Sequence, residues 1–306
     1  MRSLAVKRAF ARRVRALERE LPAALEHDVE ALHRSRVASR RLRAILPVLG
    51  LGPMADDDPV AGTARKRIRR VTRALGSVRE LDVAIGILGE VEQAHPDLEE
   101  VVTAARAGVE EERRSRREAM AVQLQEIEAQ TLAGDLAMLE DRVGQESPAA
   151  RSASLRHRLE RRVDRLDAAI DAAGALYAFD RLHLVRIAVK QLRYTLELIH
   201  EFGRVPTKRS VNTLRRFQDL LGRQHDLEVV AGYVRRLGCI GKGQFADDVQ
   251  RVLGVLERET RELHAEYLAG VGRLVDVIAR CRGEIDRRLA EGPPPRRQTR
   301  GSSHGG

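Results

Sequence analysis

Residues 32–49 read LHRSRVASRRLRAILPVL, and the interpretation of the whole chain starts from this stretch. Four basic side chains recur in it at helical spacing: His33, Arg36, Arg40 and Arg43. At about 100° per helical residue these four, the first basic stripe, fall within an arc of roughly 80° on one helix face. Leu42, Ile45 and Leu49 fall on the opposite face, so we expect a helix that buries one side and presents positive charge on the other.

Acidic residues are missing around this stripe and in three other windows. No Asp or Glu occurs in residues 31–55, 59–79, 181–196 and 203–218, which together hold 21 of the 55 Lys and Arg residues. The other 34 basic residues are outnumbered by all 45 acidic ones, so the chain outside the windows is net negative. Solvated helices usually mix both signs to gain i,i+4 pairs. The exclusion of acids therefore predicts a site for an external anion.

Composition bounds the kind of protein. The 306 residues are 43% hydrophobic and 3% aromatic, with a formal net charge of +10, which indicates a folded chain with a polyanionic partner such as nucleic acid, an anionic membrane or another polyanion. No apolar run reaches the roughly 20 residues of a membrane span, so we expect no membrane partner and a cytoplasmic location. Cys239 and Cys281 lack metal-type spacing and are expected to be ordinary thiols.

Gly and Pro punctuation divides the chain into helical segments, and strand-like alternation is missing, which predicts an all-α fold. The expected helices are 4–25, 28–49, 59–75, 80–93, 97–130, 132–143, 152–173, 176–202, 206–221, 226–237, 245–268 and 271–289. Residues 1–17 are Arg-rich and acid-free, as in a mitochondrial transit peptide. Their apolar residues Leu4, Phe10, Val14 and Leu17 favour a core-facing helix instead.

Two blocks repeat in the same order across the chain midpoint. The first basic stripe recurs 150 residues later as His183, Arg186, Lys190 and Arg193, the second basic stripe. LGSVRELDV at 75–83 recurs 146 residues later as LGRQHDLEV at 221–229. The repeat predicts two similar helical halves, about 1–147 and 148–290, in one domain of residues 1–290. We expect a linker at 144–148 and a disordered Pro/Arg/Ser/Gly tail at 291–306.

The chemistry of these residues suits phosphate. Arg presents a permanently charged planar fork that donates two hydrogen bonds to phosphate oxygens, and Lys contributes a point charge. A neighbouring basic row lies at Lys66, Arg69, Arg70 and Arg73, with a thinner counterpart at Lys208, Arg215 and Arg216. The expected phosphate-binding side chains are His33, Arg36, Arg40, Arg43, Lys66, Arg69, Arg70, Arg73, Arg79, His183, Arg186, Lys190, Arg193, Lys208, Arg215, Arg216 and His225.

Catalytic and metal signals are weak. The two stripe histidines stand among guanidiniums that repel a cation, so they suit phosphate better than metal. Glu80 and Asp226 follow a Leu-Gly pair and are expected to begin helices, where a carboxylate is favourable. The acidic loop at 56–58 is expected to start the helix at Pro59 rather than to hold a divalent cation. No phosphate loop or activated nucleophile is present, so we expect no catalytic residue, no metal and no cofactor.

The two histidine-led stripes, each followed by a Leu-Gly block, resemble the CHAD family, the conserved histidine α-helical domain. The resemblance spans about residues 4–289 and implies two four-helix-bundle-like halves related by pseudo-twofold symmetry, with basic helices meeting at a central surface or pore. It also implies binding of inorganic polyphosphate and association with polyphosphate granules. Lys190 departs from the Arg of the first stripe, and His225 stands where the first block has Arg79.

These observations favour non-enzymatic binding of inorganic polyphosphate. A nucleic-acid-binding helical module is the main alternative, because its electrostatics would be similar. Only nine aromatic residues exist, and Tyr194 and Phe217 are the two within the acid-free windows, which gives few platforms for stacking bases. A metal-dependent phosphoanhydride hydrolase that uses the acidic positions is a third possibility. The sequence does not fix an oligomeric state.

Overall fold

The protein is represented by a computed structural model that describes residues 3–26, 28–49, 59–127, 129–143, 148–203, 207–238 and 242–285. No strand occurs within these ranges, which confirms the all-α fold class. The helices are α1 Ser3–Leu25, α2 Val29–Ile45, α3 Pro59–Ala94, α4 Glu99–Glu126, α5 Ala129–Arg142, α6 Pro148–Ala173, α7 Phe179–Gly203, α8 Lys208–Gly238, α9 Gln244–Gly270 and α10 Gly272–Arg280.

Helix α2 forms as its sequence predicts. The Asp28 carboxylate caps its start by accepting hydrogen bonds from the backbone N–H groups of Glu30, at 2.8 Å, and Ala31, at 2.9 Å. A short 3-10 turn, Leu46–Val48, follows it and contains a proline. Leu42 and Ile45 have no exposed surface, so the apolar face of the helix lies in the core.

The N-terminal segment is the core-facing helix α1. Phe10 and Leu17 are buried, as the apolar pattern predicts, and Val14 is nearly so. Leu4 was assigned to the same seam, and this was wrong, because 58% of its surface is exposed near the start of the helix. The first turn of α1 therefore extends beyond the core.

The expected breaks after Leu-Gly do not occur. Helix α3 continues through Leu75 and Gly76 for 36 residues, and α8 continues through the equivalent pair for 31 residues. Glu80 and Asp226 therefore lie inside helices, and their assignment to helix starts was wrong. An internal glycine costs about 1 kcal/mol relative to alanine, which is small for a helix packed against neighbours along its length.

Both glycines instead give an arginine room to approach the helix. A Cβ at Gly76 would lie 3.5 Å from Nε of Arg36, and a Cβ at Gly222 would lie 3.9 Å from Nε of Arg186. The guanidinium of each basic stripe thus crosses the next helix at its Leu-Gly pair. A side chain larger than alanine at Gly76 would compete with the guanidinium of Arg36 for space.

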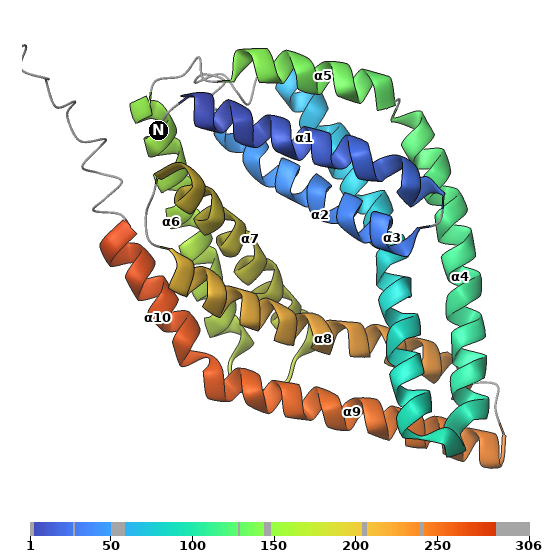
Figure 1. Ribbon diagram of the computed structural model, residues 1–306. Coiled ribbons are helices and arrows are strands. Elements are labelled where there is room, and N and C mark those ends of the chain that lie inside the picture. Colours follow the sequence, from blue (N-terminus) through green and yellow to red (C-terminus); the bar gives the residue numbers. More distant parts are fainter. Residues whose placement is uncertain are drawn as a thin grey trace, which may run out of the picture.

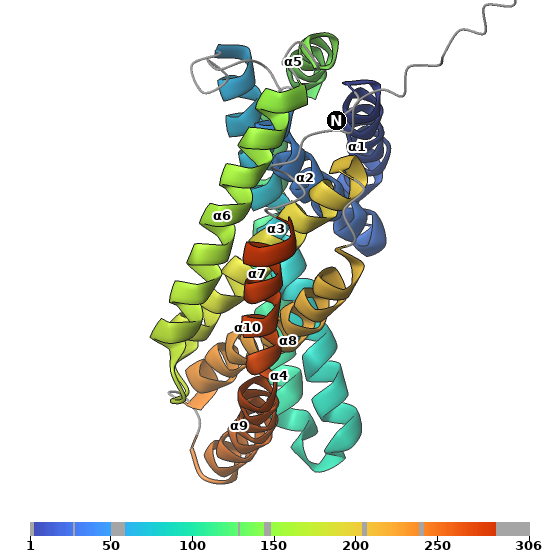
Figure 2. The same cartoon turned by 90° about the vertical axis from the view of Figure 1, so that its left-hand side faces the viewer.

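Helices adjacent in the chain pack together in two series, α1–α2–α3–α4 and α6–α7–α8–α9 (Figure 1). The two series meet where α3 contacts α8, where α4 contacts α8 and α9, and where α2 contacts α7. Helix α10 packs against α6 and α8 and leads into a π-helical turn, Cys281–Ile285 (Figure 2). The basic stripes lie on α2 and α7, so one of these junctions brings them together.

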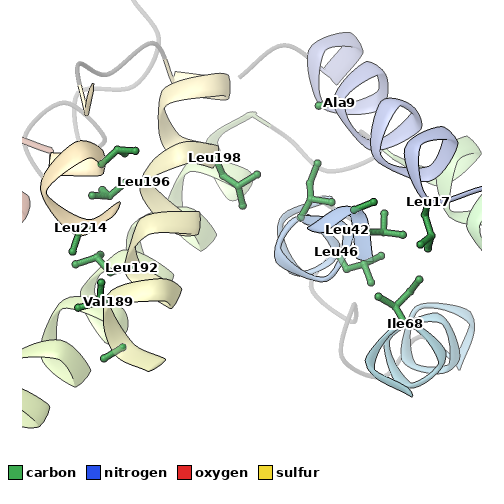
Figure 3. Packing of buried hydrophobic residues seen from close by; sticks show 14 of the residues in the cluster. Ala9, Leu17, Leu42, Leu46, Ile68, Val189, Leu192, Leu196, Leu198 and Leu214 are labelled. Atoms are coloured by element: carbon green, nitrogen blue, oxygen red, sulfur yellow. The ribbon is translucent and has the colours of Figure 1, made fainter. Parts of the chain in front are cut away.

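Two hydrophobic clusters form the core, and the long helices α3 and α8 take part in both. In the larger cluster Leu42 and Ile68 pack with Leu17 on one side, while Val189 and Leu214 pack on the other (Figure 3). Leu198 of α7 points from that second group toward the α2 side in the same view. This cluster includes residues of α1, α2, α5, α6, α7 and α10.

The smaller cluster joins the C-terminal parts of α3 and α8 to α4 and α9. Along α3 the membership changes between Val78 and Leu81, and along α8 it changes between Leu221 and Leu227. The repeated second block of the sequence therefore marks the place where each long helix passes from one cluster to the other. The two halves of the chain share a core there instead of forming separate bundles.

Several expectations fall outside the described residues: the acidic loop 56–58, the linker residues 144–147, Cys239 and the tail 291–306. The domain limits at 1–290, with halves 1–147 and 148–290, stay predictions. Within the part of the chain that the structure covers, no helix has the length and low polarity needed to cross a bilayer.

Candidate functional site

The two basic stripes face each other at the α2–α7 junction. Six side chains define what we name the α2–α7 basic cluster: Arg36, Arg40 and Arg43 from α2, and Arg186, Lys190 and Arg193 from α7. Arg36, Arg40, Arg43 and Arg186 all lower the pKa of Lys190, and Arg193 lowers that of Arg40, as is expected of charges only a few ångströms apart. Cations separated by about 150 residues in the chain are thus concentrated in one place.

Tyr194 links the two sides of the cluster. The Arg40 guanidinium carbon lies 5.4 Å from the centroid of its ring, and that of Arg193 lies 4.5 Å from it. Both distances are in the cation–π range. Arg193 also donates to Gln218 at 3.0 Å and pairs with Glu197 on its own helix. Arg193 is therefore the member of the cluster whose charge is already compensated.

Burial without compensation characterises the centre of the cluster. Burial is the main cause that lowers the pKa of Arg36 to about 10, and repulsion from Arg40 is the second. Burial and the same arginine lower the pKa of Lys190 to about 7, with further contributions from Arg186, Arg36 and Arg43. Among the described residues, none of Arg36, Arg40, Arg43, Arg186 and Lys190 forms an ion pair through its side chain. Glu80 acts on Arg36 and Asp226 interacts with Arg186, but neither carboxylate forms an ion pair with them. An anion placed here would therefore meet partly desolvated cations that have no ion pair.

The two stripe histidines occupy different surroundings. His33 is exposed, and partial burial together with Arg79 lowers its pKa. His183 is half-buried, and the centroid of its ring lies 4.9 Å from that of His225. Burial is the main cause that lowers the pKa of His183, and the neighbouring His225 is the second. Phe179 stacks on His225 at 5.4 Å. The second stripe therefore begins in an aromatic cluster that has no counterpart at His33 within the described residues.

The repeated second blocks meet where α3 and α8 cross. Nε2 of His225 lies 3.3 Å from a carboxylate oxygen of Glu80, and a hydrogen bond from this histidine lowers the pKa of Glu80. Burial raises the pKa of the neighbouring Asp226. His225 therefore bridges α8 to Glu80 of α3, and its role in phosphate binding stays a prediction.

The neighbouring basic row reaches the cluster at one point. Burial lowers the pKa of Arg43, and repulsion from Arg69 is the second cause, so Arg69 lies close to the first stripe. Arg70 instead pairs with Glu126 of α4 at 2.9 Å. Lys66 and Arg73 are exposed on α3. The regular spacing of the row on one helix therefore does not mean that its four cations have the same surroundings.

The counterpart on α8 lies on the surface. Lys208, Arg215 and Arg216 are exposed, and Arg216 pairs with Glu266 of α9 at 2.7 Å. Arg215 contacts the side chain of Asn212 at 3.5 Å. No interaction in the described residues joins these three to the α2–α7 basic cluster, so their role in binding stays a prediction.

Two arginines of α6, Arg158 and Arg162, extend the cluster and are not among the binding residues expected from the sequence. Burial, followed by repulsion from Arg162, lowers the pKa of Arg158 to about 10. Arg162 contacts Gln191 of α7, and burial and nearby arginines that include Arg43 lower its pKa. Their i,i+4 spacing matches that of a stripe, but Glu160 lies between them, so the search for acid-free windows missed this helix.

A second arginine-rich region lies beside the cluster. A cavity of about 630 Å³, the α1–α2–α7 groove, is lined by residues of all three helices, including His33. Of its three lining acids, Glu197 pairs with Arg193, and the other two are each shared by two arginines. Glu201 pairs with Arg12 at 2.7 Å and Arg13 at 2.6 Å, while Glu20 pairs with Arg19 and Arg34. Hydrogen bonds from these two arginines lower the pKa of Glu20.

Metal and thiol chemistry receive no support from the described residues. They contain no group of three or more His, Cys, Asp or Glu side chains placed to hold a metal ion. Cys281 is buried, and burial raises its pKa to about 12, so its thiol is unreactive near neutral pH.

Comparison with known proteins agrees with this architecture. A family model described as "CHAD domain" matches residues 8–235. The crystal structure of the CHAD domain from the plant Ricinus communis aligns with a TM-score of 0.60 and 25% identity, over 88% of this chain and 91% of that one. PptA from Streptomyces chartreusis aligns with a TM-score of 0.55 and 17% identity, over 91% of this chain and 98% of that one, which shows likeness of fold.

No curated protein matches the chain. The family match, however, begins within α1 and ends within α8, so it contains both basic stripes and both Leu-Gly blocks. These are the elements that form the α2–α7 basic cluster and the α3–α8 crossing. The chain belongs to the CHAD domain family.

Proposed function

We propose that this protein binds inorganic polyphosphate in the α2–α7 basic cluster and does not hydrolyse it. The observation that carries the proposal is the gathering of five cations, Arg36, Arg40, Arg43, Arg186 and Lys190, with no ion pair among the described residues. Holding such charges together and partly away from water costs free energy. A linear polyanion would remove that cost and accept several charge-assisted hydrogen bonds at once.

The arrangement favours a chain of phosphates over a nucleic acid. Nucleic-acid modules of this kind use aromatic rings as stacking platforms for bases. Tyr194 is the aromatic residue in the cluster, and the guanidiniums of Arg40 and Arg193 lie against its ring. Phe217, the other aromatic residue in the acid-free windows, is 3% exposed. A base would therefore find little ring surface, whereas phosphate oxygens need only the cations.

The geometry of the two stripes suits a linear ligand. Ten residues of helix rise about 15 Å, so each stripe can contact several successive phosphates. We propose that the two halves are related by pseudo-twofold symmetry and that α2 and α7 form the walls of one basic track. Arg158 and Arg162 would extend the track toward α6. In the cell, such binding would place the protein in the cytoplasm at polyphosphate granules.

Competition between polyanions tests the proposal. Polyphosphate of defined lengths, RNA and DNA are titrated against the full chain at equal total phosphate and at several salt concentrations, because electrostatic affinity depends steeply on salt. We expect polyphosphate to displace both nucleic acids, with affinity that rises with chain length until the track is filled. Displacement of polyphosphate by nucleic acid at equal phosphate would contradict the proposal.

The non-enzymatic part is tested on the same samples. Free phosphate is measured over hours with Mg²⁺ or Mn²⁺ present, and the length of the polyphosphate is checked on a gel. We expect neither release nor shortening. Release that disappears when Glu80 is replaced by Gln would instead identify a hydrolase that uses the α3–α8 crossing.

A further inference from the structure

Lysine is rare in this protein, and one lysine stands at the centre of the basic cluster. The chain has five lysines among its 55 basic residues: Lys7, Lys66, Lys190, Lys208 and Lys242. Lys190 takes the place in the second stripe that Arg40 takes in the first. Unlike guanidinium, an amine becomes a nucleophile when it loses its proton. The substitution therefore brings a new chemical property into the cluster.

The surroundings of Lys190 favour the neutral amine. Arg36, Arg40 and Arg43 face it from α2, and Arg186 lies one turn away on its own helix. Lys190 is half-buried, and no ion pair or hydrogen bond to its ammonium occurs within the described residues. Burial and four guanidiniums destabilise the charged form of the amine. With a pKa of about 7, a large fraction is unprotonated at neutral pH.

The same guanidiniums would hold a phosphate group next to this amine. An arginine fork binds a terminal phosphate through two hydrogen bonds, and binding beside the nucleophile raises the effective concentration of the attached group. Small acyl phosphates, mixed anhydrides of a carboxylic acid and phosphoric acid, carry a phosphate for the arginines and an electrophilic carbonyl carbon for the amine. Their two ends match the two kinds of side chain present.

We propose that Lys190 is a site of acylation by small acyl phosphates, whose phosphate is held by the arginines of the α2–α7 basic cluster. The inference rests on the affinity for phosphate groups advanced as the proposed function. Nζ attacks the carbonyl carbon, a C–N bond forms, and the C–O bond to phosphate breaks, with its electron pair leaving on the phosphate oxygen. The proton lost by nitrogen goes to the departing phosphate, so the products are an amide on Lys190 and hydrogen phosphate.

Acylation would change the cluster in a defined way. The amide cannot be protonated, so the positive charge that the amine would take up beside a bound polyanion is lost from the place where the two stripes meet. Polyphosphate and acyl phosphates would compete for the same arginines, and bound polyphosphate would shield the amine. The reaction is therefore expected to weaken polyphosphate binding, and bound polyphosphate is expected to suppress the reaction.

The test uses acetyl phosphate and the other lysines of the chain as internal standards. The full-length protein is incubated at pH 7.5, and acetylation of each lysine is followed by mass spectrometry over a range of reagent concentrations. Lys66, Lys208 and Lys242 are exposed, so they report ordinary reactivity. We expect Lys190 to react at least about tenfold faster, with a rate that saturates with reagent as binding before transfer requires. The rates at the three exposed lysines should rise linearly.

Two further measurements separate the possible explanations. A neutral acetylating ester, which has no phosphate, should show linear kinetics at every lysine, and the Lys190→Arg variant should leave the rates at the exposed lysines unchanged. Added polyphosphate should slow acetylation by acetyl phosphate at Lys190 and leave the rate at Lys242, which is not among the expected binding residues, unchanged. Linear kinetics at Lys190 with acetyl phosphate, or rates equal to those of the exposed lysines, would overturn the proposal.

Failure of this inference is distinguishable from failure of the proposed function. If polyphosphate binds tightly while Lys190 reacts no faster than the exposed lysines, the acylation site is refuted and polyphosphate binding is retained. If Lys190 reacts selectively but polyphosphate neither binds nor protects it, the cluster recognises small acyl phosphates and the proposed function is refuted.

Discussion

The α2–α7 basic cluster and the α1–α2–α7 groove contain the same residue type in opposite electrostatic states. In the groove, Arg12 and Arg13 share Glu201, and Glu20 holds another pair of arginines. In the cluster, Arg36 and Arg40 face other cations and form no ion pair within the described residues. The two regions therefore do not differ in their density of arginine but in charge compensation, and missing compensation is the ground on which we propose the cluster as the anion site.

Charge reversal in the two regions gives the largest expected contrast. We expect Arg40→Glu combined with Lys190→Glu to lower polyphosphate affinity at least about 100-fold, because each reversal removes a charge-assisted contact and adds repulsion. The matched control, Arg12→Glu with Arg34→Glu, changes the net charge equally in the groove and should cost about threefold or less. Affinity is measured by calorimetry at fixed salt, and circular dichroism checks helicity. Equal losses in the two variants would remove the distinction between the regions.

Neutralising the central lysine separates binding from stability. We expect Lys190→Met to weaken polyphosphate binding about tenfold and to raise the free energy of unfolding without ligand by about 1 kcal/mol, because a poorly compensated charge is removed from a partly buried place. Thermal unfolding and calorimetry measure the two effects. A variant that is less stable and binds normally would show that the lysine has a packing role.

The pH dependence of the same variant follows from the lowered pKa. The folded pKa of Lys190 is about 7 and the reference value is 10.5, so between these values the unfolded chain binds more protons. The Lys190 amine therefore makes the free energy of unfolding of the wild-type protein increase as pH rises from about 7 toward 10. The gain should be smaller in Lys190→Met, measured by denaturant unfolding at several pH values. Parallel curves for the two proteins would contradict the assignment.

The α6 arginines test how far the cluster extends. We expect the double variant Arg158→Gln and Arg162→Gln to bind long polyphosphate about threefold to fivefold more weakly, because peripheral charge contacts are lost. Binding of short chains should be almost unaffected. Binding of two defined chain lengths is compared in parallel titrations. An equal loss for both lengths would place these arginines at the centre of the site instead.

The neighbouring basic row offers the smallest expected effect. Arg70 is exposed and already paired with Glu126, so Arg70→Gln should change polyphosphate affinity less than about twofold. Arg69, which lies near Arg43, supplies the comparison on the same helix, and Arg69→Gln should cost more. Both are measured in the same competition titration. A larger loss for Arg70 would show that the ion pair opens when the ligand binds.

Much of this architecture could be predicted from the sequence because it depends on local pattern. The apolar face of α2 and the two basic stripes follow from helical spacing, and the resemblance to the CHAD family implied that the basic helices meet. The Leu-Gly blocks misled the prediction, because glycine at position 76 makes room for Arg36 instead of ending a helix. Only the packing of α2 on α3 reveals that reason.

Compensation of charge could not be predicted, because it depends on residues far apart in the chain. Glu126 and Glu266 neutralise Arg70 and Arg216 from other helices, and nothing in the local sequence indicates these pairs. The opposite case is Arg158. Glu160 lies two residues away in the sequence, but within the described residues it pairs with His157 and not with Arg158. The acid-free windows located the stripes correctly but could not rank their members.

A crystal structure of the protein with bound polyphosphate of defined length tests the central claim most directly. The account predicts phosphate groups between α2 and α7, with oxygens within hydrogen-bonding distance of Arg36, Arg40 and Lys190 and the ion pairs of the groove intact. Phosphates bound in the α1–α2–α7 groove or along Lys66 and Arg73, with the α2–α7 basic cluster empty, would contradict it.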